Sequence, residues 1–408
     1  MPEVPQIAEV TVIAPDGSRQ DAGTIEQAIA LPGAHHVEVT YRYAPELLPQ
    51  PGDGEGMWRY RRLLPLESGA IRYPLAVGGT PLVRAARLAH ELGLPHLHLK
   101  DETRGPSSSN KDRATALVLE WGLRRGAEVV TCASTGNVAS SLAVGAAAAG
   151  LRAVICVPHG TSPLKLQLMR AAGADVVEVE EGYTAAFALS REAARAYGWL
   201  DRNTGVNPLT TEAKKTVAYE IWEQLGRTMP DVVVAPVGDG PTIAALAKGF
   251  RELLLCGVTG RMPRLIGVQS QGMDPLVRRL HGLSPLGPDA AGTIAEGIAV
   301  PEPVSAAVVL RDVAESGGTL LSIPDAEILD AGALLLARAG ICAEPAGASA
   351  VAGLREALRQ GLLSADDQVV ALVTGSGLKT PQFLPAPQAV PTIRAGLPAL
   401  LGAMRPLP

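Results

Sequence analysis

The chain is 408 residues long, enough for two or three domains at about 150 residues each. Hydrophobic residues make up 47% and charged residues 19%, an ordinary globular composition that excludes a chain that stays unfolded. The formal net charge is -5 and aromatic residues make up only 3%, so the chain lacks both the basic surface and the stacking platforms that nucleic acid requires. We therefore expect no nucleic acid partner.

No apolar run approaches the roughly 20 residues that span a bilayer, and the first ten residues lack the basic and apolar regions of a secretion signal. The sequence therefore predicts a cytoplasmic protein with no membrane partner. The four cysteines include no C-x-x-C pair and stand in apolar runs, which favours reduced packing residues over a disulfide or a zinc site. The histidines show no metal-ligand spacing, and we expect no bound metal.

Residues 1–75 differ from the rest of the chain, because proline and glycine punctuate 49–56 and an aromatic, basic stretch follows at 57–65. This composition predicts an N-terminal arm that packs on the body. From Ile71 onward, short aliphatic runs alternate with longer segments of helical period, which is typical of a parallel sheet covered by helices. The predicted strands are 96–100, 128–131, 152–157, 175–179, 231–235, 264–268 and 368–373.

The segments between these strands show helical periodicity and complete an α/β alternation. The predicted helices are 111–125, 137–149, 162–172, 183–197, 211–226, 241–255, 272–280, 325–339 and 347–359. In an open α/β sheet, ligands bind beyond the carboxyl ends of the strands, where strand-to-helix turns expose backbone N–H groups. The polar turns at strand ends are therefore the places to look for a site.

The turn Gly238-Asp239-Gly240-Pro241-Thr242 follows a predicted strand and precedes a predicted helix. Its glycines let the backbone approach an anion, and the positive end of the helix would face that anion, so the turn suits a phosphate. The sequence matches neither the Walker motif nor G-x-G-x-x-G, which disfavours a nucleoside triphosphate or a dinucleotide. A plain strand-to-helix turn is the alternative interpretation.

Lysine is scarce, with only seven copies, so a lysine inside the serine-rich turn 107–113 is informative. Lys111 opens a predicted helix, where the helix dipole disfavours the ammonium form and helps to make the nucleophilic amine that a Schiff-base lysine requires. A solvated side chain at the start of a helix is the simpler alternative.

Two further turns combine hydroxyl groups with glycine: STGN at 134–137 and TGSG at 374–377. The first places hydroxyls at a helix N-terminus, which suits a carboxylate, although helix capping is the alternative role of Ser134 or Thr135. The second follows another predicted strand, and a plain glycine-rich turn is its alternative. We expect the four turns to converge on one cleft.

Taken together, these turns resemble the fold type II family of pyridoxal-phosphate enzymes, most closely threonine synthase and its paralogues. The matching segments appear in the family's order: WRY at 58–60, GGTPL at 78–82, LKDE at 99–102, SNKDR at 109–113, ASTGN at 133–137, PVGDG at 236–240, AEPAGASAVAGL at 343–354 and TGSGLK at 374–379. The resemblance implies the α/β fold of the tryptophan synthase β type, with two doubly wound domains and an N-terminal extension. The implied divisions are an arm at 1–75, a domain with the Schiff-base lysine at 76–230, a domain with the phosphate turn at 231–385, and a tail at 386–408.

The resemblance also implies a role for each matching residue. Lys111 would form the Schiff base with pyridoxal 5'-phosphate (PLP), and Asn137 would hydrogen-bond the ring hydroxyl of this cofactor. Thr374 would meet the pyridine nitrogen, and a hydroxyl there is expected to favour elimination and replacement over transamination. The cofactor phosphate would be held by Gly238, Asp239, Gly240 and Thr242. The substrate carboxylate would be held by Ser134 and Thr135.

Two departures from the family pattern lie close to the predicted cofactor site. Asn110 stands where phenylalanine usually precedes the lysine. Pro241 removes one N–H donor from the phosphate turn, and the hydroxyl of Thr242 is a candidate replacement.

A third departure affects the substrate. Threonine synthases typically read N-P-x-R-x-E-G-Q-K-T, where the arginine and a nearby Asn-Ser pair grip the substrate phosphate. Here Thr210 replaces the arginine and Thr204-Gly205 replaces the pair, and a threonine is no equal of arginine's bidentate fork. Lys214 or Lys215 would compensate if turned inward, but we expect both to lie on an exposed helix face.

We therefore predict a PLP-dependent carbon-oxygen lyase or synthase of the threonine synthase type, acting on a small amino acid as a homodimer. Overall similarity favours conversion of O-phosphohomoserine to threonine. Loss of the arginine at position 210 favours a threonine or serine dehydratase, or a β-replacement enzyme for another hydroxy amino acid or its ester. A non-catalytic ligand-binding paralogue is disfavoured by the retained Lys111, and a nicotinamide-dependent oxidoreductase by the missing glycine fingerprint.

Overall fold

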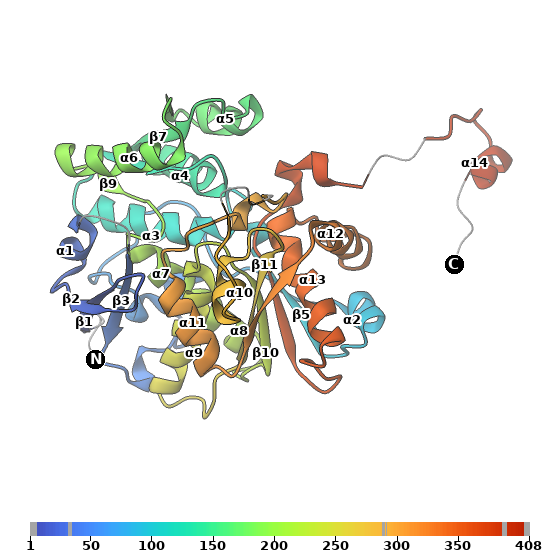
Figure 1. Ribbon diagram of the computed structural model, residues 1–408, viewed down its shortest axis with the longest axis horizontal. Helices are drawn as coiled ribbons and strands as arrows, with labels where there is room; N and C mark the ends of the chain where they lie inside the picture. Colours follow the sequence, from blue (N-terminus) through green and yellow to red (C-terminus); the bar gives the residue numbers. More distant parts are fainter. Residues whose placement is uncertain (1–5, 32–34, 288–289, 291, 386–389, 404–408) are drawn as a thin grey trace.

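The computed structural model describes residues 6–31, 35–287, 290, 292–385 and 390–403. Its strands form three sheets (Figure 1), with orders β2-β1-β3, β12-β11-β10-β13-β5-β4 and β8-β7-β6-β9. The four-stranded sheet and its helices lie at the upper left of Figure 1, and the six-stranded sheet lies at the centre and right. The predicted α/β class is confirmed.

The N-terminal region builds a sheet of its own, which the sequence patterns did not predict. Its strands are antiparallel, and its elements are β1 (Ile7–Ile13), β2 (Arg19–Asp21), α1 (Ile25–Ala30) and β3 (His36–Tyr41). Two 3-10 helices follow: η1 (Pro45–Leu47) and η2 (Gly56–Leu63). The second carries the aromatic, basic stretch, and it buries Met57, Tyr60 and Leu63. The burial of these three side chains anchors the end of the N-terminal arm to the rest of the protein.

The four-stranded sheet is parallel throughout. Its strands are β6 (Val129–Ala133), β7 (Arg152–Pro158), β8 (Asp175–Val179) and β9 (Leu200–Asp201). The helices of this part of the chain are α3 (Lys111–Arg124), α4 (Asn137–Ala149), α5 (Pro163–Ala171) and α6 (Tyr183–Tyr197). The start of α4 directly follows the turn after β6, as the sequence predicts.

The six-stranded sheet is parallel except for its edge strand β4, which is antiparallel to β5. Its strands are β4 (Leu82–Arg84), β5 (Leu97–Asp101), β10 (Val232–Pro236), β11 (Arg264–Ser270), β12 (Thr319–Ile323) and β13 (Val369–Val373). Successive side chains of a strand point to opposite faces of the sheet, so a strand covered on both faces contributes to two cores. Val232 and Val234 join the core that contains α13, whereas Val233 and Ala235 join the core that contains α9.

The remaining helices complete the layers and the chain end. They are α2 (Ala86–Leu92), α7 (Leu209–Lys214), α8 (Thr216–Gln224), α9 (Pro241–Leu255), α10 (Pro275–Leu280), α11 (Ala306–Glu315), α12 (Asp325–Ala339), α13 (Pro345–Arg359) and α14 (Leu397–Ala403). The short 3-10 helices are η3 (Glu102–Arg104), η4 (Glu296–Ile298), η5 (Gly377–Lys379) and η6 (Pro381–Phe383). Helix α14 lies apart from the rest of the described chain in Figure 1.

The order of the sheets bears on the predicted division into domains. Strands β4 and β5 precede the four-stranded sheet in the sequence, yet they pair with the strands that follow residue 230. The domain boundaries at 75, 230 and 385 therefore remain a prediction, and they do not account for β4 and β5, which precede residue 230 but belong to the six-stranded sheet.

All four cysteines are free thiols. Over the ranges that the structure describes, no helix combines the length and apolar character needed to cross a membrane.

A buried cluster of charges connects the start of α3 to the six-stranded sheet and to α8. Arg113 donates to Glu102 at 2.7 Å and to Glu220 at 2.6 Å, and Lys100 donates to Glu220 at 2.6 Å. None of these four side chains is more than 3% exposed. The four residues lie on four elements, which are β5 (Lys100), η3 (Glu102), α3 (Arg113) and α8 (Glu220), so the cluster holds the first turn of α3 in place.

Replacing Arg113 by methionine tests this anchor. We expect Arg113→Met to lower the free energy of unfolding by about 3–5 kcal/mol, because Glu102 and Glu220 would remain buried with one guanidinium fewer. Denaturant unfolding of purified protein measures the change. Arg338→Gln, which breaks a surface pair with Glu91, is the control and should stay within about 0.5 kcal/mol. Equal stability of the two variants would contradict the anchoring role.

Candidate functional site

The turn before α3 meets the turns that follow β10 and β13. The backbone N–H of Asn110 donates to the carbonyl oxygen of Thr374 at 2.9 Å, and its side-chain amide donates to Thr242 Oγ1 at 3.4 Å. Ser109 and Gly375 form an isolated antiparallel bridge. These contacts place Lys111, the phosphate turn and the TGSG turn around one site.

The turn after β6 joins the same site through a network centred on Asn137. The Asn137 amide donates to the two carboxylate oxygens of Glu344 at 2.7 and 2.9 Å. Lys379 donates to Asn137 Oδ1 and to the carbonyl oxygen of Ser107, the latter at 2.9 Å. The amide of Asn137 therefore has a fixed orientation. Glu344 and Lys379 lie in segments that match the family, but the sequence alone indicates no role for either residue.

Lys111 is the first residue of α3, and its side chain is partly buried. Its Nζ donates to Asn110 Oδ1 at 2.9 Å. Burial lowers the pKa of Lys111 to about 8; the nearby Glu344 carboxylate opposes this change, and the positive charges of Arg202 and Lys379 add to it. A lysine with this pKa is neutral in roughly a tenth of the molecules at pH 7, far more than an ordinary lysine, and the neutral amine is the nucleophile.

The backbone of the phosphate turn 238–242 lies so close to neighbouring segments that two of its positions have no room for a side chain. Gly240 has φ +99°, and a Cβ there would lie 2.5 Å from Val309 Cγ2. A Cβ on Gly238 would lie 2.8 Å from Ile298 Cα. Both positions therefore require glycine, and the turn leads directly into the fifteen-residue helix α9.

Asp239 uses its carboxylate within the protein. Its Oδ1 accepts from the backbone N–H of Val304 at 2.7 Å, and burial raises the pKa of Asp239 to about 6. A carboxylate repels a phosphate, so any contact of Asp239 with the cofactor phosphate would come from its backbone. The side chain instead holds the segment before α11.

Asp239 also explains the glycine at position 205. Gly205 has φ +85°, and a Cβ there would lie 2.8 Å from Asp239 Oδ2. A serine at this position would combine backbone strain with a close contact to the carboxylate. The change from the Asn-Ser pair of threonine synthases to Thr204-Gly205 is therefore compatible with the aspartate at position 239.

Thr374, Ser109 and Ser134 leave hydroxyl groups for a ligand. Thr374 is 6% exposed, and its hydroxyl makes no hydrogen bond within the described residues. The Ser109 hydroxyl is buried and also without a partner in the described part of the chain. Ser134 Oγ accepts from the backbone N–H of Gly136 at 3.2 Å, a contact within the turn and not a cap of α4, and its proton remains available to donate. Thr135 lies next in the same turn and is partly buried.

The structure corrects the expectation for the lysines of the 211–226 segment. Lys214 is 2% and Lys215 0% exposed, so neither lies on an exposed helix face. The predicted single helix is two helices, and α7 packs against both α3 and α9, which leaves it no free face. Lys215 pairs with Glu212 at 2.6 Å and Glu252 at 3.0 Å. Thr210 is also buried, and its hydroxyl donates to the carbonyl oxygen of Asn207 at 2.8 Å.

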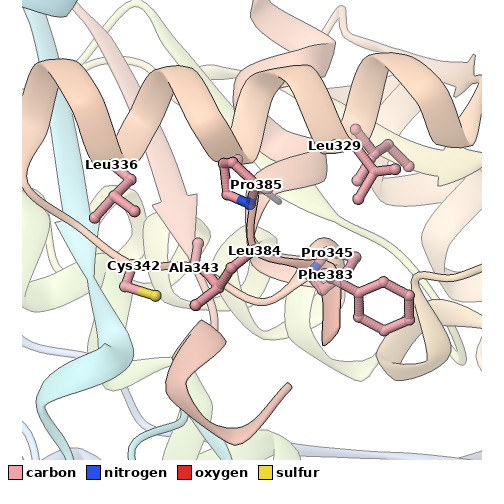
Figure 2. A pocket seen from close by; sticks show the side chains of 11 residues that line it. Leu329, Leu336, Cys342, Ala343, Pro345, Phe383, Leu384 and Pro385 are labelled. Atoms are coloured by element: carbon pink, nitrogen blue, oxygen red, sulfur yellow. The ribbon is translucent and has the colours of Figure 1, made fainter. Parts of the chain in front are cut away.

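A separate pocket lies between α12 and the segment 383–385 (Figure 2). It is lined entirely by apolar residues and one thiol: Ile328, Leu329, Gly332, Leu336, Cys342, Ala343, Pro345, Ala348, Phe383, Leu384 and Pro385. It offers no group that would bind an anion or an amine.

The fold and the cluster around Lys111 define a class of enzyme. Residues 73–375 match the family described as "Pyridoxal-phosphate dependent enzyme", and the chain belongs to this family, whose cofactor is PLP. This finding confirms the fold type and the cofactor expected from the sequence.

Within the family, the chain is similar to threonine synthases. It is 36% identical to the threonine synthase of Methanocaldococcus jannaschii over 332 residues, 80% of this chain and 81% of that protein. It is 38% identical to the threonine synthase of Methanosarcina acetivorans over 331 residues, 80% of each chain. The solved structure of processed threonine deaminase isoform 2 from Solanum lycopersicum is similar in fold, with a TM-score of 0.63 and 23% identity over 74% of this chain and 82% of that one.

The lowered pKa of Lys111 predicts how the cofactor-free protein takes up PLP. We expect the rate of uptake to rise with pH around a midpoint of about 8, because only the neutral amine attacks an aldehyde. Stopped-flow absorbance measures the rate. Glu344→Gln should move the midpoint lower, because the carboxylate that raises the pKa of Lys111 is removed. A midpoint at the ordinary lysine value of about 10.4 would contradict the burial of this amine.

Proposed function

We propose that this chain is a PLP-dependent carbon-oxygen lyase or synthase of the threonine synthase type, in which Lys111 carries the cofactor. The observation that carries the proposal is the amine of Lys111, which has a pKa of about 8 and lies beside the turn that leads into α9. The similarity to threonine synthases supports the class of reaction.

The residues of the site fit the chemical groups of PLP. The start of α9, with Gly238, Gly240 and the hydroxyl of Thr242, suits the phosphate. Pro241 lacks an N–H, but Thr242 Oγ1 only accepts from Asn110 and retains a proton to donate. The amide nitrogen of Asn137 donates to Glu344, so Asn137 would meet the ring hydroxyl through the second lone pair of Oδ1. The hydroxyl of Thr374, which has no partner among the described residues, suits the ring nitrogen. The backbone of Asp239 completes the phosphate turn.

The side chains of the site then have distinct tasks. Bound PLP supplies an electron sink for negative charge at the substrate Cα. Lys111 can take a proton from Cα and return one to a neighbouring carbon, because a pKa near 8 makes its amine both an acid and a base near neutral pH. Asn110 Oδ1 positions that amine. Ser134 and Thr135 would orient the substrate carboxylate.

Two substrate options follow. Similarity to threonine synthases supports conversion of O-phosphohomoserine to threonine. The second option, dehydration of threonine or serine or β-replacement on a related ester, is supported by Thr210, whose hydroxyl donates to Asn207 instead of facing an anion. The proposal includes cytoplasmic location and a homodimer, which the resemblance to the family supports.

A substrate screen separates these options. Given O-phosphohomoserine, the holoenzyme should release inorganic phosphate together with threonine under the first option. Given threonine or serine, it should release ammonia and a 2-oxo acid under the second. Phosphate and ammonia are assayed in parallel on the same preparation. Absence of turnover on all of these compounds and on O-phosphoserine would refute the proposed lyase or synthase activity.

Reduction with borohydride tests the assignment of Lys111. The treated holoenzyme should carry one cofactor label, on the peptide that contains Lys111, because reduction makes the link between amine and cofactor permanent. Peptide mass spectrometry locates the label. Lys214 and Lys379 act on Lys111 electrostatically and are the informative controls. A label on either of them would show that the assignment is wrong.

A further inference from the structure

The start of α11 lies directly against the phosphate turn 238–242. The backbone N–H of Ser305 donates to the carbonyl oxygen of Asp239 at 3.2 Å, and the backbone N–H of Val304 donates to Asp239 Oδ1 at 2.7 Å. A Cβ on Gly240 would lie only 3.0 Å from Ser305 Cβ, so these two residues are in close contact. A shift of Ser305 would therefore displace the backbone that is proposed to meet the cofactor phosphate.

The hydroxyl of Ser305 does not cap the helix that it precedes. Ser305 is the N-cap residue of α11, where serine usually accepts a hydrogen bond from an N–H of the first turn, but within the described residues its side chain makes no such bond. Its Oγ instead lies 3.0 Å from Nδ1 of His36, the first residue of β3. Ser305 is 0% and His36 3% exposed, so this hydrogen bond is shielded from water. The side chain of Ser305 therefore serves the N-terminal sheet and not its own helix.

The ring of His36 is held in its neutral form. Burial lowers the pKa of His36 to about 4. The Glu38 carboxylate opposes this change, and the positive charges of Arg311 and Lys248 add to it. A neutral imidazole has one N–H and one acceptor nitrogen, and a serine hydroxyl can both donate and accept. The hydrogen bond between Nδ1 and the hydroxyl can therefore form with either tautomer of the ring.

Packing and charge hold the N-terminal sheet against the two helices that meet at the phosphate turn. Ile13 of β1 forms a buried cluster with Ala244 of α9 and Val308 of α11. Arg311 of α11 donates to Glu38 of β3 at 2.5 Å. Since these contacts fix the sheet on both α9 and α11, the hydrogen bond at the start of α11 has a rigid support.

We propose that His36, acting through Ser305, is a positioning residue for the turn that takes the cofactor phosphate. The inference rests on the proposed use of this turn and does not depend on which amino acid is the substrate. A phosphate is bound tightly by backbone N–H groups that are already in place, because no ordering cost is then left for the binding step. Loss of the hydrogen bond would leave a buried polar group unsatisfied and loosen the start of α11.

The affinities for PLP and for pyridoxal, which lacks the phosphate, test this role. The full chain is stripped of cofactor and titrated with each compound, and the absorbance of the bound compound gives Kd. His36→Leu and Ser305→Ala should each raise Kd for PLP by at least about fivefold, because each removes the buried hydrogen bond that supports the turn. Kd for pyridoxal should change by less than about twofold in the same variants. The double variant should resemble the single variants, because both remove the same bond.

The neighbouring histidine supplies a matched control. His35 is also buried, at 6% exposure, but its ring lies 3.3 Å from the carbonyl oxygen of Ala28, within the N-terminal region. His35→Leu should leave the ratio of the two Kd values within about twofold of the parent. His36→Asn places a polar atom as far from the backbone as Nδ1 is, and it should restore Kd for PLP to within about twofold of the parent.

Three outcomes would overturn the inference. The first is an unchanged Kd for PLP in Ser305→Ala, a small substitution that keeps the test valid even if His36→Leu does not fold. The second is an equal rise in Kd for PLP and pyridoxal, which would indicate general loosening of the structure. The third is a parent that binds PLP no more tightly than pyridoxal, which would refute the phosphate turn as well. Because these measurements need no turnover, failure of the substrate screen leaves their result unaffected.

Discussion

The site depends on one buried guanidinium, that of Arg113. Successive residues of a helix are rotated by about 100°, so the side chains at positions 111 and 113 point to nearly opposite sides of α3. Arg113 therefore binds one side of the first turn to η3 and α8, through Glu102 and Glu220, while Lys111 lies on the opposite side, beside Asn110. The reactive amine is placed by a charge cluster that never meets the substrate. Rigid support of this kind fixes the geometry that catalysis requires.

A second buried network of charges and hydroxyls connects the N-terminal sheet to α7 and α9. The hydroxyl of Tyr41 on β3 donates to Glu212, and Glu212 pairs with Lys215, which directly follows α7. Glu252 on α9 accepts from Lys215, Lys248 and Tyr219. Because Lys215 is bound on this side, its neighbour Lys214, rotated by about 100° on the helix axis, points in a different direction. The N-terminal region is thus connected to α7 and α9 through Glu212 and Glu252.

The sequence predicted the alternating elements and the position of Lys111 because both are local signals: apolar runs, glycine turns and a lysine in an unusual setting. It did not predict the N-terminal sheet, whose short strands are stabilised by pairing distant residues. It also assigned Lys214 and Lys215 to solvent, as is usual for lysine. Their burial follows from the packing of α7 between two helices, and the role of Glu344 follows from a contact 207 residues away in the chain. Such long-range contacts leave no local pattern.

The departures around position 210 belong together in physical terms. Glycine at 205 leaves room for the carboxylate of Asp239, from which a Cβ at 205 would lie 2.8 Å, and it removes one hydroxyl from the site. Burial lowers the pKa of Lys214 well below its ordinary value, the charges of Lys111 and Arg202 add to this change, and the Asp239 carboxylate opposes it. An anion beside Lys214 would raise this pKa again, so ligand binding and the charge of Lys214 are coupled. A buried lysine without an ion pair in the described part of the chain lowers stability, and such a cost is characteristic of sites shaped for a ligand.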